Sequence, residues 1–138
     1  TFIKNTLLSI SNNNFVIKYQ YTVTRTKEMS MSLPILYSLQ NCPYAMRARL
    51  GLLLAQQPVM LRAVVMKNKP TEMLDVSPKA TVPVLVLDDG SVIDESLDIM
   101  IWALHQSDPL NLLHSEDPEA YPAMLALINI HDTVFTSA

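Results

Sequence analysis

The sequence is poor in cysteine, glycine and charge, and it has no long apolar run. It contains one cysteine and two glycines among 138 residues, and 17% of its residues are charged. A single cysteine excludes a disulfide within the chain and a multi-cysteine zinc site. The scarcity of glycine and charge argues against a collagen-like or disordered polymer. Because no apolar stretch reaches the length of a bilayer span, we expect no membrane-spanning helix.

The remaining composition suits a folded domain. Apolar residues make up 49% of the chain, which is enough for a core, and the length fits one domain with a fragment of another. The net charge of -3 is mild and the positive residues are scattered, so we expect no nucleic-acid partner. The three histidines lack ligand spacing, and we expect no metal site. An unpaired cysteine, with no secretory apolar run near the N-terminus, predicts a cytoplasmic protein.

Residues 1–32 differ in composition from the rest of the chain. They are rich in Asn, Ser and Thr, and the segment Ile17–Val23 alternates apolar with polar residues, which is a strand pattern. We expect an N-terminal extension that forms an edge strand, pairs as an arm with another chain, or stays disordered. Either Met29 or Met31 would then serve as a natural start.

From residue 33 onward the pattern becomes regular. A strand, a helix and a second strand are predicted over Leu33–Ser38, Pro43–Gln56 and Val59–Met66. This order and spacing predict a parallel strand pair with a right-handed crossover. The helix is expected to bury an apolar face that consists of Met46, Leu50, Leu53 and Leu54.

The next segment predicts antiparallel strands. A short helical turn over Thr71–Val76 precedes two strands within Thr81–Ile93, where Asp89-Gly90 is typical of a hairpin turn. A helix over Asp94–Gln106 should then cover one face of the sheet. The expected fold class is α/β, a βαβ unit followed by ββα, which gives a mixed four-stranded sheet with flanking helices.

The last part of the chain predicts a linker and one further helix. This helix begins near Pro118 and is strongly apolar, so we expect a partner for it from the rest of a second domain or from another subunit. The expected division is an extension over 1–32, one domain over 33–107, and a linker with the first helix of a truncated all-helical domain over 108–138.

Cys42 stands at the head of a predicted helix, directly after a predicted strand. A cysteine there lies beside free backbone N–H groups and the positive end of the helix dipole, which favour thiolate over thiol. Pro43 suits the first helical position, and Arg47 and Arg49 add positive charge. This context favours a reactive thiol over the alternative, a small buried hydrophobe.

Four motifs carry a family likeness: Cys42-Pro43-Tyr44-Ala45 with Arg47, Lys67-Asn68-Lys69-Pro70, Thr81-Val82-Pro83-Val84-Leu85, and Asp94-Glu95-Ser96. Their order and separations resemble the thioredoxin-like N-terminal domain of cytosolic glutathione transferases, above all the cysteine-type, omega-like members. The likeness covers residues 33–113 well and the last helix loosely. Residues 1–32 have no counterpart in it.

The resemblance implies a catalytic role for Cys42 as the nucleophile that forms a mixed disulfide with glutathione. Position 45 is alanine where dithiol relatives carry a second cysteine, so we expect monothiol chemistry with free glutathione as co-substrate. Val82 and Pro83 match a cis-proline turn whose backbone at Val82 pairs with the cysteinyl part of glutathione. The alternative is a strand-opening proline at a sheet edge.

The resemblance also implies three residues that bind the two ends of glutathione. Glu95 and Ser96 match a helix-start pair in which Ser96 and free N–H groups hold the γ-glutamyl carboxylate and Glu95 pairs with the α-ammonium. The plain alternative is an N-terminal acid and a cap that stabilise the helix, and this role is compatible with ligand binding. Lys69 matches a lysine near the glycyl carboxylate, although a loop lysine is usually only solvated.

Two classes of function are compatible with these residues. The first is a glutathione-dependent thiol transferase or reductase, of the omega-like or dehydroascorbate-reductase type, that acts on a small electrophilic or disulfide substrate. The second is a non-enzymatic binding or regulatory module that resembles stringent-starvation-type or chloride-intracellular-channel-like relatives. The intact set of site residues favours the first, and the missing helical domain favours the second. We expect a homodimer or larger assembly through the last helix, with the N-terminal arm as a second contact.

Overall fold

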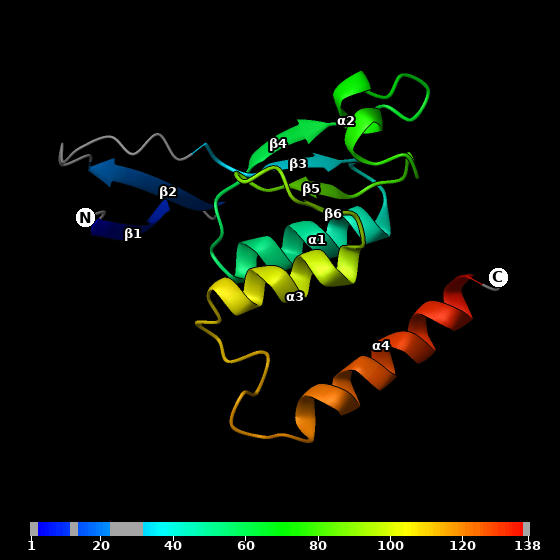
Figure 1. The fold of residues 1–138 in the computed structure, drawn as a ribbon. Coiled ribbons are helices and arrows are strands. Elements are labelled where there is room, and N and C mark those ends of the chain that lie inside the picture. Colours follow the sequence, from blue (N-terminus) through cyan, green and yellow to red (C-terminus); the bar gives the residue numbers. More distant parts are fainter. Residues whose placement is uncertain (1–2, 12–13, 23–31, 137–138) are drawn as a thin grey trace. The chain divides into compact units, whose positions relative to one another are not determined.

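The computed structural model describes residues 3–11, 14–22 and 32–136, in two units that divide between Met31 and Ser32 (Figure 1). In the first unit, β1 (Ile3–Ser11) pairs antiparallel with β2 (Asn14–Thr22). The alternating segment lies in β2 up to Thr22, as its pattern predicts, and Val23 lies outside the described residues. An edge-strand or arm role for this unit stays a prediction.

The second unit is built on a mixed four-stranded sheet with the order β4-β3-β5-β6. β3 (Ile35–Ser38) runs parallel to β4 (Met60–Ala63) and antiparallel to β5 (Val84–Val86). β6 (Val92–Ile93) pairs antiparallel with β5. The turn between them contains Gly90 at a φ of 84°, which glycine adopts without steric cost. The βαβ and hairpin predictions are therefore confirmed.

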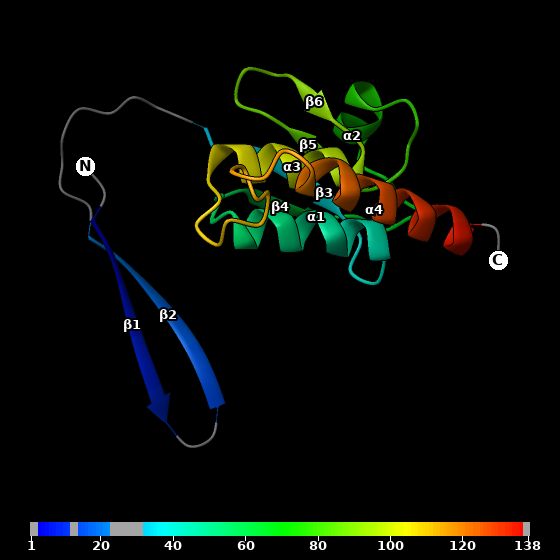
Figure 2. The same cartoon turned by 90° about the horizontal axis from the view of Figure 1, so that it is seen from below.

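Three helices cover the two faces of this sheet. α1 (Pro43–Leu54) and α3 (Ser96–Gln106) lie side by side on one face (Figures 1 and 2). α2 (Thr71–Val76) packs on the other face, because its buried Met73 joins a cluster with Tyr37, Val64 and Val84. The neighbours of those strand residues in the sequence point to the opposite face, where Leu36 and Leu85 pack against α1 and α3.

The buried face of α1 differs from the predicted one. Met46, Leu50 and Leu53 are more than half exposed, and the buried positions are instead the small residues Ala45, Ala48 and Gly51, with Leu52. Leu54, the fourth predicted residue, is half-buried. The prediction was wrong for the other three because this helix is apolar nearly all round, so periodicity cannot select a face.

The buried face of α1 consists mostly of small residues because they allow α3 to approach closely. A Cβ atom added to Gly51 would lie 2.6 Å from Cγ and 2.8 Å from Cα of Met100 on α3. The two helices thus pack nearly backbone to backbone at this point.

A connector over 107–119 leads to the last helix, α4 (Ala120–Thr136). The Asp108 carboxylate accepts hydrogen bonds from the backbone N–H groups of Leu112 and Leu113, at 2.8 and 2.7 Å, and both leucines pack against the α1–α3 core. Within the part of the chain that the structure describes, no helix is long and apolar enough to cross a membrane.

Candidate functional site

Cys42 immediately precedes the first turn of α1. Its backbone is extended (φ −83°, ψ 122°), and its carbonyl accepts the first helical hydrogen bond from the Met46 N–H at 2.9 Å. The side chain is a free, half-buried thiol whose Sγ lies 3.9 Å from the carbonyl oxygen of Val82. The thiol therefore lies next to the Val82-Pro83 turn, although 40 residues separate Cys42 from Val82.

Val82 is half-buried and precedes Pro83 through a cis peptide bond, as the resemblance implies. Pro83 is buried and directly precedes β5, so both Val82 and Pro83 lie outside the strand. Among the described residues, the Val82 N–H has no backbone hydrogen bond. An edge-like stretch of main chain therefore lies beside the thiol.

Arg49 fixes the loop that leads into Cys42. Its guanidinium donates hydrogen bonds to Ser38 Oγ and to the carbonyl oxygens of Leu39 (3.0 Å) and Gln40 (2.8 Å). Sequence reasoning treated Arg49 only as a nearby positive charge. Through these three hydrogen bonds Arg49 instead holds the end of β3 and the residues that follow it in place.

Ser96 and Glu95 stand at the start of α3. Ser96 is buried, at 4% exposure, and its Oγ accepts a hydrogen bond of 3.5 Å from Arg47 Nη1. Glu95 occupies the N-cap position, but its side chain makes no capping hydrogen bond. Its carboxylate pairs instead with the Lys79 ammonium. The cap alternative therefore does not describe the Glu95 side chain.

Arg47 connects this helix start to α4. Its guanidinium forms a two-pronged ion pair with the Asp132 carboxylate, with Nη1 at 2.8 Å from Oδ2 and Nη2 hydrogen-bonded to Oδ1. These hydrogen bonds lower the pKa of Asp132 to about 2 and raise the pKa of Arg47 above its ordinary value. The Arg47 guanidinium also lies 5.8 Å from the centre of the Tyr44 ring, a cation–π contact.

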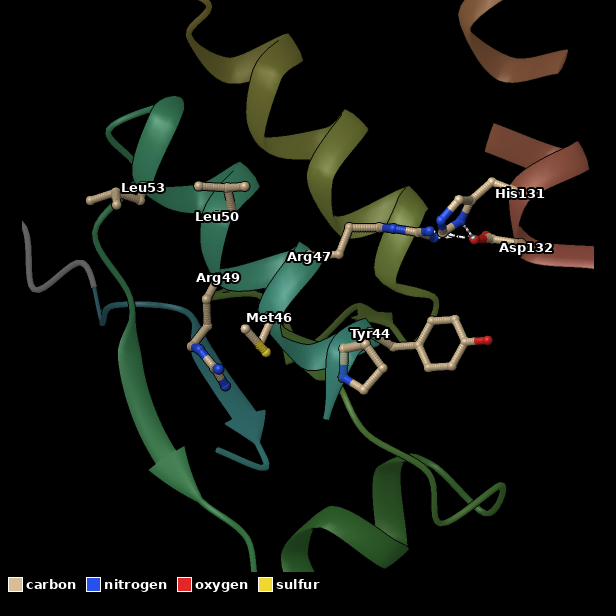
Figure 3. Close-up of a pocket in the computed structure, with 9 residues that line it drawn as sticks. Tyr44, Met46, Arg47, Arg49, Leu50, Leu53, His131 and Asp132 are labelled. Carbon is tan, nitrogen blue, oxygen red and sulfur yellow. Dashed lines mark hydrogen bonds and ion pairs between the residues drawn. The ribbon is translucent and has the colours of Figure 1, made fainter. Parts of the chain in front are cut away.

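A cavity of about 660 Å³ opens between α1 and α4 (Figure 3). Pro43, the residue that follows Cys42, is part of its lining. Its lining is mostly apolar, and the Arg47–Asp132 pair and His131 stand at one end. The residues that line it are Pro43, Tyr44, Met46, Arg47, Arg49, Leu50, Leu53, His131 and Asp132. The apolar side chains that sequence reasoning assigned to the core thus form a wall of this cavity.

Among the described residues, Lys69 is a predicted site residue that no hydrogen bond or ion pair joins to the others. It is half-buried in the loop after β4, where Val65 and Asn68 form an isolated bridge. Within residues 32–136, no hydrogen bond or ion pair joins Lys69 to Cys42, Val82, Glu95 or Ser96. The described residues also hold no group of three His, Cys, Asp or Glu side chains that could bind a metal ion.

A βαβ–ββα sheet in which a lone cysteine starts the first helix, beside a cis-proline turn, defines a thioredoxin-like domain. The model of the family described as glutathione S-transferase, N-terminal domain, matches residues 36–111, which is more than half of the chain. The chain therefore belongs to the glutathione S-transferase family, and the predicted resemblance is confirmed.

Solved structures show the same fold. A glutathione transferase homologue from Sulfitobacter, crystallised with bound glutathione, is similar with a TM-score of 0.63 at 19% identity, over 72% of this chain and 48% of that one. An omega-class enzyme, Omega 3C from Trametes versicolor, gives 0.59 at 26% identity, over 65% and 41%. A glutathione S-transferase from Methylobacillus flagellatus with glutathione bound gives 0.58 at 27% identity, over 65% and 44%.

The chain spans less than half the length of each of these three proteins. No curated protein matches it.

Proposed function

We propose that this protein is a glutathione-dependent thiol transferase or reductase, of the cysteine-type, omega-like kind, in which Cys42 forms a mixed disulfide with glutathione. The observation that carries the proposal is the position of the Cys42 thiol at the start of α1, 3.9 Å from the Val82 carbonyl oxygen. The thiolate is the form of cysteine that attacks a disulfide in thiol–disulfide exchange. Cys42 is a free cysteine and is only half-buried.

The proposed reaction is a pair of thiol–disulfide exchanges. The Cys42 thiolate attacks the glutathione sulfur of a glutathionylated substrate, so that a Cys42–glutathione disulfide forms and the substrate leaves as a thiolate that takes up a proton. A second glutathione, as its thiolate, then attacks this disulfide, releases the Cys42 thiolate and leaves as oxidised glutathione. Ala45 provides no thiol that could resolve the intermediate, so free glutathione must do so.

Five further residues would bind glutathione. The backbone of Val82, set by Pro83, would pair with the cysteinyl part. Ser96 and the first N–H groups of α3 would hold the γ-glutamyl carboxylate, and Glu95 would pair with the α-ammonium. Lys69 would meet the glycyl carboxylate. The Arg47–Ser96 hydrogen bond supports this arrangement, because it orients the Ser96 hydroxyl.

The co-substrate would enter from the apolar cavity between α1 and α4, which suits a small electrophile or disulfide with an apolar body. No metal takes part in the proposed chemistry. A reaction that depends on reduced glutathione is suited to the cytoplasm, where we place the protein.

Turnover of a defined substrate tests the proposal. The full chain, given the mixed disulfide of glutathione and cysteine, should produce oxidised glutathione only in the presence of free glutathione. Cys42→Ser should abolish this turnover. Glu95→Gln should raise the KM for glutathione by about tenfold, because a charge-assisted bond to the α-ammonium is lost.

Glu72→Gln is the matched control, because Glu72 is an exposed acid on α2 that is not among the proposed glutathione contacts. It should leave both kcat and KM unchanged. Turnover that survives in Cys42→Ser would refute the assigned nucleophile. The absence of turnover in the wild-type chain would favour a binding or regulatory module instead.

A further inference from the structure

Lys79 already occupies the position that a ligand ammonium would need. Its Nζ pairs with Glu95 Oε1 and also lies 3.5 Å from Asp94 Oδ1. The Glu95 pair is the closer of the two, and it raises the pKa of Lys79 above the ordinary lysine value. A protonated amine thus sits on the carboxylate that, in the proposed function, receives the α-ammonium of glutathione.

The loop that carries Lys79 is fixed on both sides. A turn hydrogen bond of 3.0 Å joins the Ala80 N–H to the Ser77 carbonyl oxygen, and Ala80 has a φ of 55°. Ser77 is 1% exposed and donates a hydrogen bond of 3.2 Å to Asp94 Oδ2. Val82 follows Lys79 by only three residues. The chain therefore holds the Lys79 backbone close to both proposed glutathione contacts.

The two carboxylates differ in how firmly they are held. Asp94 keeps its hydrogen bond from the buried Ser77 whether or not Lys79 is near. The Glu95 side chain is 62% exposed and can turn toward a ligand, while the Lys79 ammonium can remain on Asp94. Lys79 can thus give up Glu95 without losing all its ionic contacts.

We propose that Lys79 is a specificity-determining residue that competes with the α-ammonium of the ligand for the Glu95 carboxylate. This inference rests on the proposed function. Lys79 pairs with Glu95 in the structure, and a ligand that bears an ammonium displaces it. A ligand without the ammonium leaves the Lys79–Glu95 pair in place. The difference in affinity between an amine-bearing ligand and a ligand without the amine is therefore smaller with Lys79 than without it.

Calorimetry with two non-reactive ligands tests the competition in the full chain. The first is S-methylglutathione, and the second is S-methyl glutaryl-cysteinyl-glycine, which lacks only the α-amino group. Lys79→Gln should bind S-methylglutathione about two- to fivefold more tightly than the wild type, the range expected when a partly exposed ion pair no longer competes. It should bind the glutaryl ligand no more tightly, so the ratio of the two affinities should rise.

Two variants complete the design. Arg62→Gln, on the exposed edge strand β4, changes the net charge by the same amount and should leave both affinities unchanged. Lys79→Arg keeps the cation and should behave like the wild type. Thermal unfolding of each variant checks that the fold is retained, as expected for an exposed side chain.

The outcomes distinguish the competition for Glu95 from the proposed function. If the wild type binds S-methylglutathione but Lys79→Gln binds it equally or more weakly, the competition is refuted while the proposed function stands. If both affinities rise equally in Lys79→Gln, the effect is general electrostatics and the competition is again refuted. If the wild type binds neither ligand, the proposed function fails, and this inference fails with it.

Discussion

Arg47 is the residue that joins the most distant parts of the site. It starts from the first turns of α1, donates to Ser96 on α3 and pairs with Asp132 on α4. The sequence indicated that Arg47 adds positive charge near the thiol and belongs to the motif that begins at Cys42, but it did not indicate these partners. Its partners lie 49 and 85 residues away, so they depend on how the helices pack. The one available signal was that Asp132 is the only acid in the described helix α4.

The Arg47–Asp132 pair predicts a pH-dependent stability. The pKa of Asp132 falls from 3.8 to about 2 on folding, so the stabilisation is fully present above pH 3.8 and is lost as the pH falls through about 2. Asp132→Asn should therefore reduce the free energy of unfolding at pH 7 by about 0.5–1 kcal/mol, as expected for a partly exposed pair. Denaturant unfolding at several pH values measures the difference.

The difference between wild type and Asp132→Asn should shrink between pH 4 and pH 2. Asp117→Asn serves as the control, since Asp117 is an exposed acid in the connector that forms no ion pair among the described residues. A difference between wild type and Asp132→Asn that stays constant down to pH 2 would show that Asp132 acts through packing and not through its charge.

The individual site residues were predictable to different degrees. The proximity of Cys42 to Val82 could be expected only because four motifs together resemble one family, since neither residue specifies the other by spacing. Lys79 was missed, although it is the only cation between residues 70 and 94 and thus the nearest in sequence to the two acids at the α3 start. The roles of Cys42, Lys69, Val82, Glu95 and Ser96 in binding and catalysis stay predictions.

At the scale of elements, the strands and helices were predictable and the buried face of α1 was not. Turn chemistry and proline placement located α2 at Thr71–Val76 and the hairpin around Gly90 as the structure has them. α1 is different because leucines and methionine lie on one side and small residues on the other, and both sides are apolar. Which side is buried depends on the distance to α3, a long-range property.

The close approach of α1 and α3 makes Gly51 a sensitive position. Gly51→Ala should lower the free energy of unfolding by about 1–2 kcal/mol. Overpacking destabilises by about 1–3 kcal/mol, and the higher helix propensity of alanine offsets up to about 1 kcal/mol of this. The clash cannot be relieved by rotating a side chain alone, because it involves Met100 Cα at 2.8 Å. Denaturant unfolding measures the change.

Leu53→Ala on the same helix is the control for Gly51→Ala. Leu53 is 64% exposed, so its truncation should change the free energy of unfolding by less than about 0.5 kcal/mol. The packing explanation would be wrong if the alanine at position 51 were neutral or if Leu53→Ala were the more damaging of the two.

At the scale of the whole molecule, the exposed apolar stripe on α4 supports self-association. Leu127, Ile130 and Val134 are each at least 60% exposed. The homodimer expected from the sequence stays a prediction, in which this stripe of one copy would pack against the same stripe of another.

Light scattering of the chain should then give the mass of a dimer at micromolar concentrations. Ile130→Asp should shift the mass to that of a monomer, because it places a charge in the apolar contact. Asn129→Asp adds the same charge at a neighbouring exposed position of α4 and should leave the dimer intact. A wild-type monomer whose α4 is helical by circular dichroism would contradict this assembly.

The most direct test of the account is the rate at which the folded chain reacts with oxidised glutathione. Intact-mass spectrometry should detect one glutathionyl group, bound at Cys42 and absent in Cys42→Ser, and it should form much faster in the native chain than in the chain unfolded by denaturant. Equal rates in the two states, or no adduct in the native state, would contradict the claim that the fold activates this thiol.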